Sequence, residues 1–136
     1  MLFGDQHVQT YRDSNGEQGY EWNGTTILLL GTVGRKSGEP RTHPLIYRDY
    51  PGRDGSYLVV ASKGGADNPP AWYLNLLERP EVRVQIKDDV FTARARVASA
   101  EEKPALWEYM TQVWPDYDEY QQKTSRPIPV VVLERV

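Results

Sequence analysis

Three strand-like segments follow one another in the first half of the chain, joined by tight turns. The first, Thr25 to Val33, is apolar and β-branched, which is typical of a buried strand. The second runs from Thr42 to Tyr50, and the third from Ser56 to Ala61. Such short connections, rich in glycine and proline, join strands as hairpins. These three segments and their short connections therefore predict an antiparallel meander.

The second half of the chain adds a hairpin, a helix and a last strand. Two alternating segments, Val82 to Ile86 and Val90 to Ser99, flank a polar turn. Ser99 to Glu102 resembles a capping box before a helix to about Val113, and Ile128 to Glu134 is strand-like. The predicted fold class is α+β, with about six mostly antiparallel strands and two or three helices, and we expect the sheet to close into a barrel.

The chain has the size of one domain, residues 1–136, with residues 1–24 as an N-terminal arm. The polar arm is interpreted as loosely held, with a lid over a pocket as the alternative. No apolar segment approaches the length of about 20 residues that spans a membrane, and no secretory signal is evident. The absence of cysteine and a net charge of −3 favour a cytoplasmic protein that binds no nucleic acid. Peripheral contact with the inner face of the membrane is the alternative, and the oligomeric state stays open between monomer and dimer.

Residues 61–77 combine a strand end, a small-residue turn and a helix start. Ser62 and Lys63 precede two glycines, whose backbone freedom allows a ligand to approach the main chain closely. Trp72 and Tyr73 follow, and core packing is a strong alternative explanation for both. Asn75 stands between leucines and needs hydrogen-bond partners if it is buried. This stretch predicts a binding site.

A second candidate is the basic loop, defined as residues 34–41. It contains Arg35, Lys36 and Arg41 together with Ser37 and a single acid. Exposed backbone N–H groups and cations can hold a phosphate or carboxylate. Taken alone, the basic loop is more typical of a solvated hairpin turn than of a binding site, and it lacks the spacing of a P-loop.

Aromatic residues recur at a spacing of three near the C-terminus: Trp114, Tyr117 and Tyr120. On a helix they share one face, where they either plug the core or form a pocket rim. His7 and His43 stand far apart without clustered carboxylates, so we expect no metal site. Without a reactive group of its own, the chain fits a protein that orients a bound cofactor.

Four motifs together resemble one family, the deazaflavin-dependent nitroreductases, which are split β-barrel oxidoreductases that use coenzyme F420. The motifs are GRKSGEPRTHPL (34–45), ASKGGADNPPAWYLNL (61–76), RPEVRVQ (79–85) and WPDYDEYQQKTSRPIPVVVLE (114–134). The resemblance implies hydride transfer from reduced F420 to an electron-poor small molecule: a quinone, an activated alkene or a nitroaromatic compound. Trp114 and Ile46 stand where the prodrug-reducing member has tyrosines, which favours quinone or enone reduction here.

The resemblance also implies roles for individual residues. The cofactor site would comprise Arg35, Lys36, Ser37, Arg41, Thr42, His43, Pro44, Leu45, Ile46, Val60, Ala61, Ser62, Lys63, Ala71, Trp72, Tyr73, Leu74, Asn75 and Tyr117. The acceptor would meet Ile46, Ser62, Trp114, Tyr117 and Tyr120. Our hypothesis is that the Ser62 and Tyr117 hydroxyls hydrogen-bond the acceptor oxygen. The alternatives are an FMN-dependent split-barrel enzyme, a non-catalytic deazaflavin carrier and a binding module for an apolar ligand.

Overall fold

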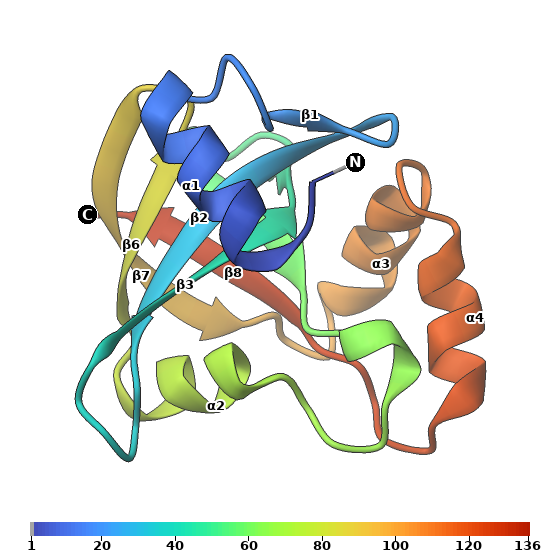
Figure 1. Ribbon diagram of the computed structural model, residues 1–136. Coiled ribbons are helices and arrows are strands. Elements are labelled where there is room, and N and C mark those ends of the chain that lie inside the picture. Colours follow the sequence, from blue (N-terminus) through green and yellow to red (C-terminus); the bar gives the residue numbers. More distant parts are fainter. Residues whose placement is uncertain (1) are drawn as a thin grey trace.

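The computed structural model describes residues 2–136 as a strongly curled antiparallel sheet with helices around it (Figure 1). The helices are α1 (Gly4–Ser14), the 3₁₀ turn η1 (Lys63–Gly65), α2 (Ala71–Glu78), α3 (Lys103–Thr111) and α4 (Asp116–Lys123). The strands are β1 (Glu21–Trp22), β2 (Thr25–Val33), β3 (Pro40–Ile46), β4 (Arg48–Asp49), β5 (Ser56–Val60), β6 (Glu81–Ile86), β7 (Asp89–Val97) and β8 (Val130–Arg135). The predicted α+β split barrel is confirmed.

The strand pairings run around a ring. The path β2–β6–β7–β8–β5–β4 is antiparallel throughout, and β3 pairs with the other edge of β2. β3 and β4 are one run of chain interrupted at Tyr47, so this run pairs with β2 first and with β5 afterwards. The single strand predicted for residues 42–50 is therefore two strands, and the bend between them lets the sheet close.

The ring is split beside β3. Over residues 40–46, β3 pairs only with β2 among the described strands, so its second edge is free. Pro44 lies in this strand opposite Leu29, as expected for a residue that cannot donate to a ladder and is confined to edges. The free edge faces the chain that leaves β5, and the candidate site described below opens there.

β8 separates the two main apolar clusters because its residues are buried on both faces. Val131 and Leu133 pack inside the ring, with Leu28 and Val59. Val130 and Val132 point the other way and pack under α3 and α4. A strand that is covered on both faces reads as a continuous apolar run, and PVVVL is such a run. α4 is thereby fixed beside η1 (Figure 1).

The N-terminal arm is packed, and the interpretation of a loosely held arm is wrong. α1 buries His7, Val8 and Tyr11 against the ring. The Tyr11 hydroxyl donates to the carbonyl of Ile27 (3.0 Å) and accepts from the backbone N–H of Lys87 (2.7 Å). These contacts outweigh the polar composition of the arm, which was the basis of the prediction. Within residues 2–136, no helix is long and apolar enough to cross a membrane.

Candidate functional site

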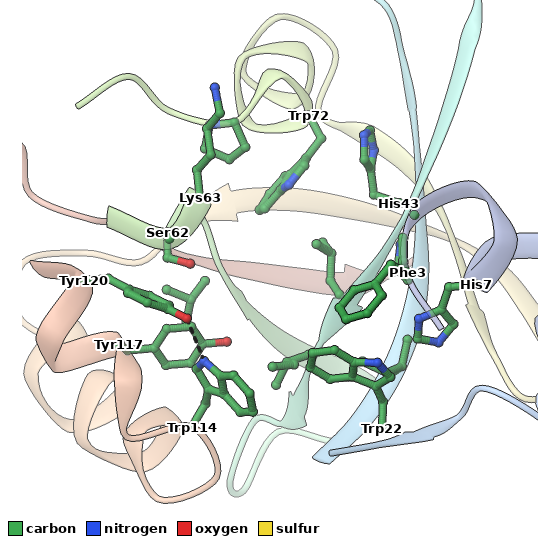
Figure 2. Close-up of a pocket in the computed structure, with 18 of the residues that line it drawn as sticks. Phe3, His7, Trp22, His43, Ser62, Lys63, Trp72, Trp114, Tyr117 and Tyr120 are labelled. Carbon is green, nitrogen blue, oxygen red and sulfur yellow. Dashed lines mark hydrogen bonds between the residues drawn. The ribbon is translucent and has the colours of Figure 1, made fainter. Parts of the chain in front are cut away.

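A cavity of ≈ 580 Å³ opens at the split of the ring, between the free edge of β3, the chain after β5 and α4 (Figure 2). Most of its lining comes from four parts of the sequence, the N-terminal arm, β3, the 62–72 stretch and the 114–120 segment, and β2 and β5 add one residue each. The lining residues are Leu2, Phe3, Gly4, His7, Trp22, Ile27, His43, Pro44, Leu45, Ile46, Val60, Ser62, Lys63, Gly64, Pro70, Ala71, Trp72, Trp114, Tyr117 and Tyr120. This volume lies in the range of small-molecule sites.

Aromatic side chains form much of the wall. The ring centroids of Trp22 and Trp114 are 5.8 Å apart, and Phe3 stands edge-on to Trp22 at the same distance. The indole N–H of Trp114 donates to the hydroxyl oxygen of Tyr120 at 3.3 Å. The N-terminal arm and the segment that leads into α4 therefore meet across the cavity, and together they offer flat apolar faces to a planar ligand.

Three hydroxyls point into the cavity, those of Ser62, Tyr117 and Tyr120 (Figure 2). Burial, and then the neighbouring Tyr120, raises the pKa of Tyr117 well above its ordinary value. Its hydroxyl therefore keeps its proton at neutral pH and can donate a hydrogen bond. A few polar groups on an apolar wall fix the orientation of a bound molecule.

The turn that carries Ser62 has an unusual backbone. Lys63, Gly64 and Gly65 have φ angles of 45°, 64° and 85°, so three consecutive residues are left-handed. Two of them are glycines, which accept this conformation without strain, but Lys63 does not. The predicted role of the double glycine as the point where the chain turns is confirmed.

Twelve predicted site residues line the cavity: His43 to Ile46, Val60, Ser62, Lys63, Ala71, Trp72, Trp114, Tyr117 and Tyr120. The other predicted residues lie outside it: Arg35, Lys36, Ser37, Arg41, Thr42, Ala61, Tyr73, Leu74 and Asn75. Trp72 is 5% exposed, so the interpretation of core packing is confirmed, although its side chain also reaches the cavity wall. The predicted roles in binding stay predictions.

Asn75 has the hydrogen-bond partners that its place between leucines requires, and it lies outside the cavity. Its side chain is buried, its amide N–H donates to the Thr32 hydroxyl (3.1 Å), and its oxygen accepts from the backbone and guanidinium of Arg35 (both 3.1 Å). Asn75 thus fixes the start of the basic loop to α2. Arg41 forms an exposed ion pair with Glu39 at 3.3 Å, and Lys36 is exposed.

Several lining residues were missed because nothing in the sequence marks them. Phe3, His7 and Trp22 belong to an arm whose polar composition hid its packing. The Nε2–H group of His7 donates to the carbonyl of Gly19 (2.7 Å), which holds its ring at the cavity wall. The Nδ1 atom of His43 is buried without a hydrogen-bond partner among the described residues. Burial lowers the pKa of His43, so its imidazole is neutral at neutral pH.

Metal-ligating side chains do not gather anywhere in residues 2–136. No group of three or more His, Asp or Glu residues in that range is arranged to hold an ion. The polar side-chain groups of the lining residues are instead hydroxyls, imidazoles, indole N–H groups and the ammonium group of Lys63. They suit an organic ligand that carries oxygen or nitrogen atoms.

Comparison with known proteins agrees with the geometry. The sequence profile of the F420H(2)-dependent quinone reductase family matches residues 4–135. An F420H(2)-dependent quinone reductase of Mycobacterium tuberculosis is 40% identical over 134 residues, which are 95% of this chain and 87% of the relative. A protein of the same name from another strain of that species is equally similar.

Solved structures extend this similarity to the fold. An F420-H2-dependent reductase, FDR-A, is 41% identical, with a TM-score of 0.70 over 79% of this chain and 93% of the other. A structure described as a domain-swapped dimer is 37% identical, with a TM-score of 0.73 over 93% of this chain and 95% of the other. A Listeria innocua structure described as a pyridoxamine 5′-phosphate oxidase shares only the fold, at 12% identity and a TM-score of 0.55 over 95% and 92% of the two chains.

Proposed function

The chain belongs to the F420H(2)-dependent quinone reductase family, and from this premise we propose that it reduces a quinone with reduced F420 in the cavity at the split of the ring. It is an oxidoreductase, and F420 is the cofactor that its family uses. The match over residues 4–135 carries this conclusion. An FMN-dependent enzyme is not favoured, since the similarity to the oxidase-like structure shows the fold alone.

The residues of the cavity fit a planar, oxygen-rich cofactor and acceptor. The volume suffices for a fused ring system, and Trp22, Trp72 and Trp114 offer apolar faces to it. The buried Nδ1 of His43 lies in the β3 wall without a partner, which is typical of a polar atom whose environment is completed by a ligand or by water. The basic loop lies outside the cavity, and we propose that it binds the acidic tail of the cofactor through Arg35, Lys36 and Arg41.

Reduced F420, when bound, would supply the hydride that the acceptor takes up. The protein supplies orientation and hydrogen bonds: Ser62 and Tyr117 donate from their hydroxyls to the acceptor oxygen as negative charge develops there. The aromatic residues of the lining, among them Trp22, Trp72 and Trp114, would keep water from the acceptor, which would strengthen these hydrogen bonds. A proton from solvent completes the conversion of quinone to hydroquinone. Tyr120 is held toward the same space by its hydrogen bond from Trp114.

Binding and turnover separate this function from its alternatives. F420 and FMN are titrated separately against the purified protein, and reduced F420 is then mixed with menadione, an enone and a nitroaromatic compound. We expect F420 to bind, FMN to bind weakly, and menadione to be reduced. Tight FMN binding without F420 binding would overturn the proposal, and F420 binding without turnover of any acceptor would make the protein a carrier.

The proposed hydroxyl donors are tested by removing them one at a time. We expect Ser62→Ala and Tyr117→Phe each to lower kcat roughly 10- to 100-fold, in the range of a lost donor in the transition state. Ser125→Ala and Tyr109→Phe are matched controls, because neither side chain lines the cavity. Unchanged kcat in both site variants would remove the hydroxyls from the mechanism.

The oligomeric state is a separate question. Sedimentation of the wild-type protein decides between a monomer and a dimer, the state for which one related structure is named.

A further inference from the structure

Arg126 binds the turn that carries Ser62 and Lys63, although it does not itself line the cavity. Its Nε atom donates to the carbonyl of Ala66 at 2.8 Å, and its Nη2 atom donates to the carbonyl of Ser62 at 2.9 Å. Weaker hydrogen bonds of 3.4 Å reach the carbonyl of Ala61. One guanidinium thus holds carbonyls at both ends of the turn.

The position of Arg126 is itself fixed by α4. The side-chain amide of Gln121 donates to the carbonyl of Arg126 at 2.8 Å, and its oxygen accepts from the backbone N–H of Ile128 at 2.9 Å. Gln121 lies one residue after Tyr120 on the same helix. The chain of hydrogen bonds therefore runs from the helix that carries Tyr117 and Tyr120, through Arg126, to the turn that carries Ser62.

The turn needs such a restraint because its backbone conformation is strained at Lys63. Lys63 is left-handed without being glycine, and a strained conformation persists only where its surroundings determine it. Within the turn, the backbone N–H groups of Gly65 and Ala66 bond the carbonyls of Ser62 and Lys63. The Ser62 carbonyl thus accepts two hydrogen bonds, one from the Gly65 N–H and one from Arg126. Arg126 therefore adds a restraint from outside the turn to the hydrogen bonds within it.

We propose that Arg126 is a positioning residue that holds the Ser62 hydroxyl in register with the Tyr117 and Tyr120 hydroxyls of α4, the helix packed beside the turn. This inference rests on the proposed function for its effect on catalysis. Its structural part, restraint of residues 61–66, does not. A planar fork with several fixed donors suits the task, and lysine, a single-point donor, cannot reach the same carbonyls together.

The first test uses the protein without cofactor. In hydrogen–deuterium exchange, we expect Arg126→Lys to speed exchange in the peptide containing Gly65 and Ala66 by about tenfold or more, because their N–H groups depend on the geometry of the turn. Arg48→Lys is the matched control: Arg48 is also partly buried and donates to a main-chain carbonyl, that of Tyr109 (2.9 Å), outside the cavity. Equal exchange in wild type and Arg126→Lys would overturn the restraint.

The second test asks whether the effect on turnover passes through Ser62. We expect Arg126→Lys to lower kcat roughly tenfold or more, as a small misplacement of a reacting group does. The double variant Arg126→Lys/Ser62→Ala should be no slower than Ser62→Ala alone, since both changes remove one contribution. If the kcat of the double variant falls by the product of the two single reductions, positioning through Ser62 is overturned, even if the exchange result holds. Faster exchange together with a wild-type protein that reduces no quinone would refute the proposed function and leave the restraint standing.

Discussion

At the scale of single residues, two neighbouring glycines of η1 have different tasks. Gly64 faces open space, so only its φ of +64° favours glycine there. A Cβ atom at Gly65 would lie 2.6 Å from the carbonyl oxygen of Tyr120 and 2.9 Å from its Cα atom, both backbone atoms of α4. Backbone cannot move aside as a flexible side chain can, so Gly65 determines how closely the turn approaches α4.

This difference gives a matched pair of variants. We expect Gly64→Ala to lower the free energy of unfolding by about 1 kcal/mol, the cost of a left-handed alanine. Gly65→Ala should lower it by about 3 kcal/mol or more, because a steric conflict with α4 adds to the same cost. Urea denaturation measures both free energies. If both variants lose the same free energy of unfolding, η1 and α4 can move apart to accommodate a Cβ atom at residue 65 without cost.

Prediction from sequence succeeded for residues whose role is local and failed for those whose partners are distant. Ser62, Lys63 and the glycines follow from a strand end and a turn, which adjacent residues define. Arg126 does not, because the Ser62 carbonyl that it binds is 64 positions away. Nothing about an arginine near a proline marks it as a donor to that turn.

At the scale of elements, the capping box before α3 is confirmed and has a further function. Ser99 and Glu102 exchange backbone-to-side-chain hydrogen bonds of 2.8 and 3.2 Å. Glu102 also pairs with Arg96 of β7 and accepts from the Tyr50 hydroxyl at 2.7 Å. One carboxylate therefore ties the start of α3 to β7 and to the hairpin between β4 and β5, which the spacing of the box alone could not reveal.

The same carboxylate predicts how stability depends on pH. The hydrogen bond from Arg96 holds the pKa of Glu102 at about 2, below the ordinary value of 4.5. A lowered pKa stabilises the fold above pH 4.5, and this contribution is lost as the pH falls toward 2. We expect Glu102→Gln to cost about 1 kcal/mol at pH 7, since solvent screens the pair, and much less near pH 2.

The measurement is urea denaturation of wild type and Glu102→Gln between pH 2 and pH 7. Glu101→Gln is the control, because Glu101 is an exposed neighbour on the same turn. A difference between wild type and Glu102→Gln that stays constant over this range would show that the carboxylate acts through packing and not through its charge.

The basic loop carries a second prediction for an element. Asn75 fixes its first residue, Arg35, to α2, whereas Lys36 and Arg41 extend into solvent. We expect Lys36→Ala/Arg41→Ala to weaken F420 binding roughly tenfold at low salt, with a smaller effect at high salt because exposed charges are screened. Arg53→Ala removes an exposed cation from another hairpin turn as the control. Equal affinity of wild type and the double variant would exclude the loop from the cofactor site.

At the scale of the whole molecule, the sequence predicted the strands but not how the ring is covered. Alternation and turns are local signals, so β2, β5, β6 and β7 were placed within a few residues. The bend at Tyr47 and the packing of α1 depend on the closure of the ring, which brings together segments far apart in sequence. The arm also supplies a large part of the cavity wall. Because its packing was not predicted, its lining residues Phe3, His7 and Trp22 were missing from the predicted site.

Tyr11 shows how strongly the arm is bound to the ring, and it carries the last prediction. Its side chain is fully buried, and its hydroxyl links β2 to the turn between β6 and β7 through Ile27 and Lys87. Tyr11→Phe keeps the ring in place but removes the acceptor of the partly buried Lys87 N–H and the hydrogen bond to Ile27, so we expect a loss of about 1 kcal/mol in the free energy of unfolding. The denaturant dependence should not change if the arm stays packed, and Tyr109→Phe, which removes a hydroxyl outside the cavity, should cost little. A reduced denaturant dependence for Tyr11→Phe would instead show that the arm detaches before the ring unfolds, and the cavity wall formed by Phe3, His7 and Trp22 would then open with it.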